Sequence, residues 1–240
     1  MQKSIFESFI SKYNLGGACE SVLFKVDGDV LSTRSISDDK NVLTEVAAPA
    51  QGMEEGEFAV YDTSRLRSML GVLEDNLSSS VQRSSERPTS IKFSDKGSVA
   101  TFVLADAGVI PPVPDLKKTP KFELSVDLDG EFITKFIKAK SALSDVELFT
   151  VIANEGETTA DIYLGYSSMN TNRIRLGVEK DPEVTLSEIS FSANYLREIF
   201  MANKGASGTM KISSKGLCCL TFKDNTVNSV YYLVEIDTKD

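Results

Sequence analysis

The sequence predicts an α+β fold that contains two copies of one unit, each with antiparallel strands and two helices. The first reason is a repeated segment, since "SIKFSDKG" at 90–97 is nearly reproduced as "TMKISSKG" at 209–216, an offset of 119 residues. The second reason is that two further pairs of similar segments occur, at offsets of 127 and 130 residues. Such repetition indicates an internal duplication with two copies of about 120 residues each.

The two further pairs have the same local character. "IFESFI" (5–10) places its apolar residues on one helix face, and "FITKFI" (132–137) repeats that pattern. "AVYDTSRLRSML" (59–70) is similar to "ISFSANYLREIF" (189–200), because each contains an alternating strand, a polar capping stretch and a helix with a Leu-Arg pair. We interpret the differences in offset as changes in loop length.

Each copy is expected to begin with a helix, continue through alternating strands, form a second helix and end in a hairpin. The expected helices span residues 2–14, 63–74, 130–143 and 193–204. Turns between strands are expected at Gly28, Gly97, Gly156 and Gly216. Gly17, Asn76 and Gly205 mark helix ends, and Asp129 is the expected N-cap of the third helix.

A proline-rich segment divides the chain. "AGVIPPVPDLKKTPK" (107–121) contains four of the seven prolines, and proline extends neither a helix nor a strand ladder. We therefore expect a first domain at 1–106, an extended connector over the surface at 107–121 and a second domain at 122–240.

The composition excludes several kinds of chemistry. The chain has no histidine, which excludes Ser-His-Asp and Cys-His nucleophile systems and histidine metal ligands. The common phosphate-binding loops, GxxxxGK[ST] and GxGxxG, do not occur. Cys19, Cys218 and Cys219 form no CxxC pair, which is typical of reduced thiols. We expect a protein that is not an enzyme and that uses no cofactor and no metal.

The sequence also predicts a cytosolic protein without a membrane partner. No apolar run approaches the length of a membrane span. The N-terminal segment "MQKSIFESFISKYN" is interrupted by Glu7, Ser8 and Ser11, so it lacks the continuous apolar core of a signal peptide.

Charge is distributed unevenly along the chain. The formal net charge is −9, whereas the four expected helices together carry +5, which leaves −14 on the remaining residues. An acidic protein normally repels nucleic acid, but basic helices on one surface are able to face phosphates. Solvation of an outer face explains any single basic helix, whereas the same bias in four helices favours a DNA-binding surface.

Together these features resemble a DNA sliding clamp. The similarity is to the short, two-domain clamps of large tailed bacteriophages, which are related to the PCNA clamps of eukaryotes and archaea. "FAVYDTSRLRSMLGVLEDN" (58–76) resembles the strand and second helix of the clamp, "SIKFSDKGSVATFVLAD" (90–106) the hairpin that closes the first domain, and "YYLVEID" (231–237) the last strand. The resemblance covers nearly the whole chain, although the chain is shorter than PCNA and has two units where typical bacterial clamps have three.

The resemblance implies a homotrimeric ring with helices around a central hole and sheets on the outside. Such a ring encircles double-stranded DNA without reading its sequence, tethers a replicative DNA polymerase and is opened by an ATP-driven clamp loader. The residues implied for DNA contact are Lys3, Lys12, Arg65, Arg67, Lys135, Lys138, Lys140, Arg197 and Lys204. Within the third helix, Phe132, Ile133, Phe136 and Ile137 are expected to pack inward, so that Lys135 and Lys138 point toward the hole.

The resemblance also implies two protein-binding surfaces. In the family, partners dock short peptides between the connector and the last strand, and subunits join through edge strands. The implied partner-binding residues are Val109, Ile110, Pro112, Val113 and Tyr232. The implied subunit interface joins strand 98–105 to strand 172–179 of the next chain, through Val99, Thr101, Val103, Ile174, Leu176 and Val178. The alternative for the two strands is that both are interior strands of one sheet. The alternative for the connector is that Val109 and Ile110 only pack it onto the sheet.

Two other functions stay open at this point. One is a β-rich structural or scaffold protein of a virion, in which the duplication serves assembly. The other is an enzyme with two catalytic carboxylates, although the sequence marks out no pair. A stable ring without activity favours the clamp, a monomer that turns over a substrate favours the enzyme, and presence in purified particles favours the virion protein.

Overall fold

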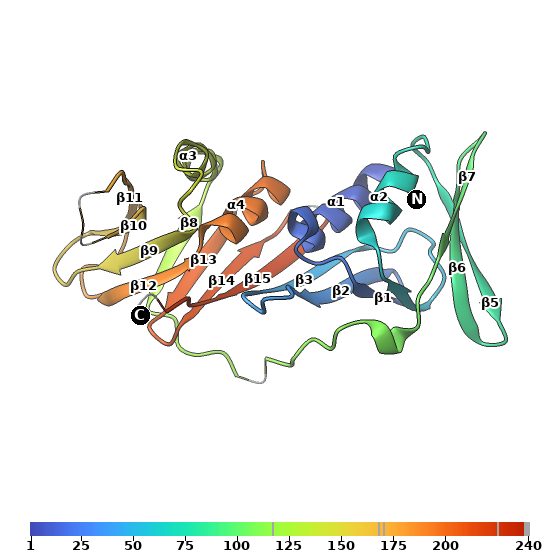
Figure 1. The fold of residues 1–240 in the computed structure, drawn as a ribbon, viewed down its shortest axis with the longest axis horizontal. Helices are drawn as coiled ribbons and strands as arrows, with labels where there is room; N and C mark the ends of the chain where they lie inside the picture. The colour runs from blue at the N-terminus through green and yellow to red at the C-terminus, as the bar shows by residue number, and fades with distance from the viewer. Residues whose placement is uncertain (117, 168, 170, 225, 238–240) are drawn as a thin grey trace. The chain divides into compact units, whose positions relative to one another are not determined.

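The chain folds into two compact units, shown as a ribbon in Figure 1. The computed structural model describes residues 1–240 except 117, 168, 170, 225 and 238–240. Unit 1 comprises residues 1–38, 43–114 and 224–229, and unit 2 comprises residues 39–42, 115–223 and 230–240. The chain passes from the helices and strands of unit 1 to those of unit 2 between Pro114 and Asp115, inside the expected connector.

Unit 1 places two helices over one sheet and adds a three-stranded sheet (Figure 1). The helices are α1 (Lys3–Asn14) and α2 (Thr63–Leu70), and short 3-10 turns follow at η1 (Leu15–Gly17) and η2 (Ala107–Val109). The first sheet has the order β4-β1-β2-β3, with β1 (Val22–Asp27), β2 (Val30–Ile36), β3 (Val42–Pro49) and β4 (Gly56–Val60). The second has the order β5-β6-β7, with β5 (Ser78–Ser84), β6 (Arg87–Ser94) and β7 (Val99–Val103). All neighbouring strands in both sheets are antiparallel.

Unit 2 has the same kinds of element. Its helices are α3 (Gly130–Ala142) and α4 (Ala193–Ala202). One set of strands has the order β11-β10-β9-β12, with β9 (Leu148–Ala153), β10 (Thr159–Leu164), β11 (Ile174–Glu179) and β12 (Leu186–Ser192). The other has the order β15-β14-β13-β8, with β8 (Leu124–Leu128), β13 (Gly208–Ser213), β14 (Leu217–Phe222) and β15 (Asn228–Val234).

The element order confirms the duplication. From α1 onward, unit 1 runs through a helix, four strands, a helix and three strands, and the chain repeats this order from α3 onward. Helix α3 begins 127 residues after α1, whereas α4 and β13 begin 130 residues after α2 and β5. The two copies are therefore related by a nearly constant offset.

The segment pair at an offset of 119 is a false match between the copies. Residues 90–97 lie in β6 and the turn to β7, whereas residues 209–216 lie in β13 and the turn to β14. The counterpart of the β13–β14 turn in unit 1 is the β5–β6 turn. The similarity arises because any hairpin with one buried face combines alternating apolar residues with a turn glycine. The duplication holds, but this pair is not evidence for it.

Side chains of the preceding loops fix the helix starts. Asp129 Oδ1 accepts a hydrogen bond from Phe132 N at 2.7 Å, which confirms the expected N-cap of α3. Asp62 Oδ1 accepts one from Arg65 N at 2.8 Å at the start of α2. Each satisfies a backbone donor that lacks a partner within the helix.

Helices α2 and α4 end two or more residues earlier than expected. Helix α2 ends at Leu70, because the chain turns at Gly71 and Val72. Leu73 N donates to Leu70 O at 3.0 Å across this turn, and the Leu73 side chain is buried. Helix α4 ends at Ala202, where Asn203 donates to Ile199 O twice, from its backbone N at 3.1 Å and from Nδ2 at 2.9 Å. Glu74 and Lys204 therefore lie outside their helices.

Aromatic side chains form the core of each unit. In unit 1, the ring centroids of Phe9 and Phe24 are 5.4 Å apart, in an edge-to-face arrangement. In unit 2, Phe136 on α3 lies 5.3 Å from Phe200 on α4 and 5.9 Å from Phe149 on β9. Phe136 and Ile133 are buried, as expected for the inward face of α3.

The flanks of α3 depart from the expected inward face. Phe132 and Ile137 are only half-buried. Phe132 still contacts Phe200, with ring centroids 6.1 Å apart, so it lies on the α4 side of the helix. Ile137 follows Phe132 by five residues, and a helix turns about 100° per residue, so Ile137 lies on the flank away from α4.

A buried ion pair and a hydrogen bond connect Lys12 of α1 to Asp224 and Val227. Lys12 is 2% exposed, and its Nζ lies 2.6 Å from Asp224 Oδ2 and donates to Val227 O at 2.9 Å. Partial burial acts to raise the pKa of Asp224, but hydrogen bonds from Lys12 and from the N–H groups of Val227 and Thr226 outweigh it and bring the pKa to about 2. The ion pair thus holds Asp224, which lies near the C-terminal end of the sequence, against α1 in unit 1.

Removing either charge is expected to destabilise the protein, but by different amounts. Asp224→Asn leaves the Lys12 ammonium buried without a counter-charge, so we expect a loss of about 3 kcal/mol in the free energy of unfolding. Lys12→Met is expected to cost less, because the Asp224 side chain is 32% exposed and keeps its backbone donors. Urea unfolding at pH 7 measures both, and equal losses would contradict this assignment.

Asp224→Asn is also expected to change how the stability of the fold depends on pH. Because folding lowers the pKa of Asp224, its carboxylate stabilises the fold above its ordinary pKa of 3.8, and this contribution is lost as pH falls toward about 2. Asp224→Asn is therefore expected to remove part of the acid sensitivity of unfolding between these pH values.

Candidate nucleic-acid and assembly surfaces

Helix α2 carries two exposed arginines, and side-chain hydrogen bonds hold its N-terminus in place. Arg65 and Arg67 are exposed, and Arg65 Nε lies 3.6 Å from Asp62 Oδ2. Glu20 supports the start of the helix, since its Oε2 accepts from Ser64 N at 2.8 Å and its Oε1 accepts from Ser64 Oγ at 2.7 Å. Partial burial acts to raise the pKa of Glu20, but hydrogen bonds led by that from Ser64 lower it on balance, so Glu20 stays ionised at neutral pH.

The two lysines of α1 are held inside unit 1. Lys3 Nζ donates to Leu73 O at 2.6 Å and lies 3.7 Å from Glu7 Oε1. Lys12 is buried in its ion pair, contrary to the expectation that it faces phosphates. The polar residues on the outer side of α1 are serines and Glu7, so this helix offers DNA few free cations.

Helix α3 separates its lysines into two groups. Lys135 is 61% exposed and Lys138 is exposed, as expected, and the hydrogen bond from Lys135 to Glu131 Oε1 raises the pKa of Lys135. Lys140 is buried, and its Nζ donates to Ser144 O at 2.9 Å. It follows the buried Phe136 by four residues, and residues four apart share a helix face, so Lys140 does not point away from the sheet.

Helix α4 contributes less charge than expected. Arg197 is half-buried and forms an ion pair with the adjacent Glu198. Lys204 is exposed just beyond the end of the helix.

Both strands expected at a subunit interface are sheet edges. Strand β7 is the outer strand of the β5-β6-β7 sheet, and β11 is the outer strand of the β11-β10-β9-β12 set. The alternative, that both are interior strands, is therefore wrong for the described residues. An edge strand leaves a row of backbone N–H and C=O groups open for pairing with another chain.

The expected residues of β7 share an exposed face. Val99, Thr101 and Val103 are all exposed, and the two valines are 67% and 74% exposed. Between them, Phe102 is buried and points toward the core of unit 1. The expected set on β7 therefore points away from the helices.

The expected residues of β11 lie on the core-facing side of their sheet, unlike the exposed residues of β7. Ile174, Leu176 and Val178 pair with Leu164, Ile162 and Ala160 of β10, which are all buried. Opposite residues of an antiparallel pair point to the same side of the sheet, so this set is directed toward the core of unit 2. Ile174 and Leu176 are half-buried because the edge leaves one flank open.

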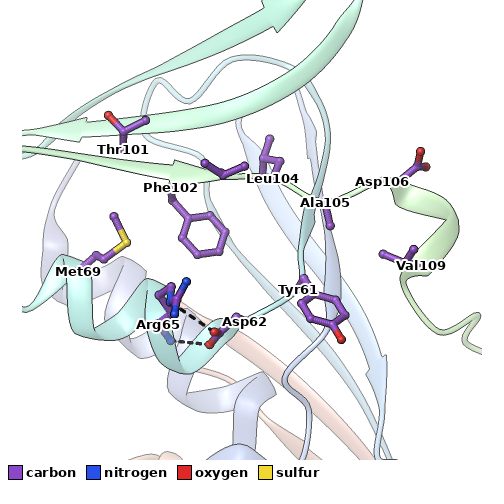
Figure 2. Close-up of a pocket in the computed structure, with 11 residues that line it drawn as sticks. Tyr61, Asp62, Arg65, Met69, Thr101, Phe102, Leu104, Ala105, Asp106 and Val109 are labelled. Atoms are coloured by element: carbon purple, nitrogen blue, oxygen red, sulfur yellow. Dashed lines mark hydrogen bonds and ion pairs between the residues drawn. The ribbon is translucent and has the colours of Figure 1, made fainter.

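An open pocket lies between α2 and β7, and Figure 2 shows its lining side chains. Its volume is about 1010 Å³. Phe102 and Met69 point into the space between the strand and the helix in Figure 2, with Arg65 and Asp62 beside them. The lining residues are Tyr61, Asp62, Arg65, Met69, Thr101, Phe102, Val103, Leu104, Ala105, Asp106 and Val109.

Two surfaces that the sequence suggests separately meet at this pocket. Val109 of the connector and Thr101 and Val103 of the edge strand all line it. Asp106 fixes the position of Val109, since its Oδ1 accepts from Gly108 N at 3.0 Å and its Oδ2 pairs with Arg87. The Gly108 hydrogen bond, followed by Arg87, lowers the pKa of Asp106. No sequence pattern relates Val109 to β7, because the fold alone brings them together.

The other connector residues do not line the pocket. Ile110 and Val113 are half-buried and Pro112 is exposed. The end of this segment is fixed to the sheet of unit 1, because Arg34 Nη2 donates to Pro114 O at 2.9 Å. Tyr232 is half-buried in β15 of unit 2. A partner groove at these residues stays a prediction.

The described residues contain no group of three or more His, Cys, Asp or Glu side chains arranged to hold a metal ion. Cys19, Cys218 and Cys219 form no disulfide within the described part of the chain, and Cys19 and Cys218 are buried. None of the helices in the described part of the chain is long and apolar enough to cross a membrane.

The fold is similar to that of solved PCNA structures over the whole chain. It matches the PCNA of A. fulgidus, solved with the C-terminal region of FEN-1 bound, with a TM-score of 0.75 and 13% sequence identity, covering 100% of this chain and 98% of that chain. The PCNA of Thermococcus kodakaraensis matches with a TM-score of 0.73 and 14% identity, covering 98% of both chains. The PCNA2–PCNA3 complex of Sulfolobus tokodaii matches with a TM-score of 0.72 and 15% identity, covering 98% of this chain and 97% of that chain.

No protein-family model and no curated protein sequence matches the chain. The structural similarity shows that the protein has a PCNA-like, two-domain α+β clamp fold, which confirms the expected fold class.

Proposed function

We propose that the protein is a DNA sliding clamp, a ring that encircles double-stranded DNA and tethers a replicative DNA polymerase for processive synthesis. The observation that carries the proposal is the similarity to PCNA structures along the whole chain. The role requires no catalytic group, which agrees with a sequence that has no histidine and no nucleotide-binding loop.

The proposed DNA surface consists of cations on or beside the helices. We retain Arg65, Arg67, Lys135, Lys138, Arg197 and Lys204, and we leave out Lys3, Lys12 and Lys140 because unit-internal acceptors occupy them. Contacts between such side chains and phosphates position the duplex without reading its sequence.

The proposed ring forms by a head-to-tail contact between identical chains. The open edge of β7 on one copy pairs with the open edge of β11 on the next, and a heterologous contact generates a ring when its rotation closes. We propose three copies, as in the clamps that the sequence resembles.

The proposed partners are those of a clamp in a tailed-bacteriophage replication system within the host cytoplasm. They are a replicative polymerase and an ATP-driven loader. A. fulgidus PCNA binds the C-terminal region of FEN-1. By analogy, we propose that this chain docks partner peptides at Val109, Ile110, Pro112, Val113 and Tyr232.

Topology, and not charge attraction, is expected to retain the ring on DNA. Three chains at −9 each carry −27, so free ring and free DNA attract only weakly. We expect a loaded ring to survive a moderate salt wash on nicked circular plasmid and to be lost once the plasmid is linearised. Gel filtration of labelled protein with a loader present measures this, and equal retention on both forms would contradict the clamp function.

The basic face of α3 is expected to matter for loading. Lys135→Glu with Lys138→Glu reverses two exposed charges, so we expect fewer rings on circular DNA with the oligomer and fold unchanged. The matched control is Lys211→Glu with Lys223→Glu, which makes the same charge change at two exposed lysines away from the helices. Equal loss in both double variants would mean that only net charge matters.

The β11 edge is expected to be needed for assembly. Leu176→Asp places a charge on the half-buried face of that edge, so we expect the oligomer to dissociate while the chain stays folded. The control Met201→Asp changes an exposed apolar residue on α4 that lies on neither edge strand. Sedimentation velocity measures the masses, and an intact trimer for Leu176→Asp would remove β11 from the interface.

The connector is expected to bind the polymerase. Ile110→Ser removes apolar surface from the proposed docking site, so processive synthesis should fall while the trimer remains intact. Val72→Ser, at an exposed apolar residue of the loop after α2, is the control. Unchanged processivity in a primer-extension assay with Ile110→Ser would place the docking site elsewhere.

A further inference from the structure

We infer that unit 2 carries a second docking site, a polar hollow beside strand β12 that binds the guanidinium group of an arginine in a partner polypeptide. The hollow has a volume of about 620 Å³. It is formed by the loop between α3 and β9, by β9, by the end of β10 with the loop that follows, and by β12, all in unit 2 (Figure 1). These residues belong to none of the surfaces proposed above, so the inference goes beyond the proposed function.

The floor of the hollow holds two hydroxyl groups whose hydrogen-bonding capacity is only partly used. Thr150 and Ser190 are 4% and 5% exposed, and they alternate along their strands with Phe149 and Phe191, which face the core. Thr150 Oγ1 and Ser190 Oγ lie 2.8 Å apart and share one hydrogen bond. Two hydroxyls have two protons and four lone pairs, so this bond leaves one proton and three lone pairs without a partner among the described residues. Buried polar groups with unused capacity point to a polar ligand.

Carboxylates around the rim make the hollow negatively charged. Asp145 and Glu147 come from the loop before β9, and Glu188 comes from β12. All three are exposed, and none of them forms an ion pair with a lysine or arginine in the described part of the chain. Ala193 N donates to Glu147 O at 2.8 Å, which holds the backbone of this rim in place. The ligand that suits the hollow is therefore a cation.

An aromatic side chain at the hollow favours a flat cation. Tyr166 lines the hollow and is 37% exposed, and its ring centroid lies 5.4 Å from that of Tyr163. The Tyr163 hydroxyl donates to Asp161 Oδ2 at 3.0 Å, which fixes this second ring. Burial, followed by the charge of Glu188, raises the pKa of Tyr166, so its ring stays neutral at pH 7. A guanidinium stacks on an aromatic face and donates several coplanar hydrogen bonds to carboxylates and hydroxyls, whereas a lysine ammonium has no flat face.

The surroundings favour an arginine within a polypeptide over the free amino acid. Free arginine also carries an α-carboxylate, which the carboxylates of the rim repel, whereas an arginine within a chain has uncharged amides in that place. Strand β12 is an outer strand of its described sheet, and Ile236 N donates to Ser190 O at 2.9 Å. No strand of the described residues pairs with β12 on the side away from β9, so the backbone of a partner has hydrogen-bonding groups to bind beside the hollow.

Binding of small arginine derivatives to the whole chain tests the site. Nα-acetyl-arginine amide is the probe, and changes in the backbone amide resonances of Thr150, Tyr166 and Ser190 report where it binds. We expect it to bind about tenfold or more tightly than Nα-acetyl-citrulline amide, which has nearly the same shape without the charge. Equal binding of the two would overturn the cation site.

Two further ligands test the identity of the cation. Nα-acetyl-lysine amide is expected to bind more weakly than the arginine probe, and equal binding would overturn the preference for a guanidinium. Free arginine is also expected to bind more weakly, and tighter binding of free arginine would overturn the docking of a polypeptide.

Matched variants separate the hollow from the general charge of the protein. Glu147→Gln with Glu188→Gln removes two carboxylates with little change in shape, so the affinity for the arginine probe should fall about tenfold or more. The control Glu155→Gln with Glu183→Gln makes the same change at two exposed residues outside the hollow and should alter the affinity less than about twofold. Tyr166→Leu should lower the affinity for the arginine probe about threefold and leave that for the lysine derivative nearly unchanged. Equal losses in both glutamate pairs, or no loss in any variant, would overturn the site.

Manganese distinguishes the proposed ligand from a metal ion. Mn²⁺ broadens the resonances of residues near its binding site, and we expect no preference for those of Thr150 and Ser190. Selective broadening there, together with displacement of the arginine probe, would assign the hollow to a metal ion and overturn the inference. The ring proposal is tested separately by sedimentation, because every residue of the hollow belongs to one unit of one chain.

Discussion

The unpaired edges of β7 and β11 are the constraint on which the rest of the structure depends. Each unit buries an aromatic core on one side of its strands, and β7 in unit 1 and β11 in unit 2 are among the outer strands of the described sheets. Natural proteins usually blunt or cover such edges, because an open edge pairs with any available strand. Here apolar side chains line one edge and half-buried apolar side chains the other. These are the edges that we propose to pair between copies.

The placement of lysines shows how an acidic chain separates structural charge from surface charge. Lys12 and Lys140 hold an acceptor inside their own unit, whereas Lys135 and Lys138 remain on the outside of α3. A buried ammonium is tolerated only with a close partner, so these two lysines contribute to the fold, and we leave them out of the proposed DNA surface. The smaller set of exposed cations agrees with the clamp function proposed above, in which topology retains the ring on DNA.

Much of this fold follows from the sequence, because helix periodicity and turn glycines are local signals. They predicted α1, α3 and the duplicated order of elements. They failed where the deciding partner is distant, since Lys12 is fixed by Asp224, 212 residues away. The hairpin pair at an offset of 119 misled because one local pattern fits several hairpins. No sequence pattern predicts that Val109 and β7 line the same pocket. The turn η2 and the hairpin bring Val109 beside β7 only in the folded chain.

An image of the particles tests the central claim most directly. Electron microscopy of the purified protein, without DNA or partners, is predicted to show a closed ring with a central hole wide enough for a DNA duplex and the mass of three chains. Single small particles at every concentration, or compact assemblies without a hole, would contradict the account.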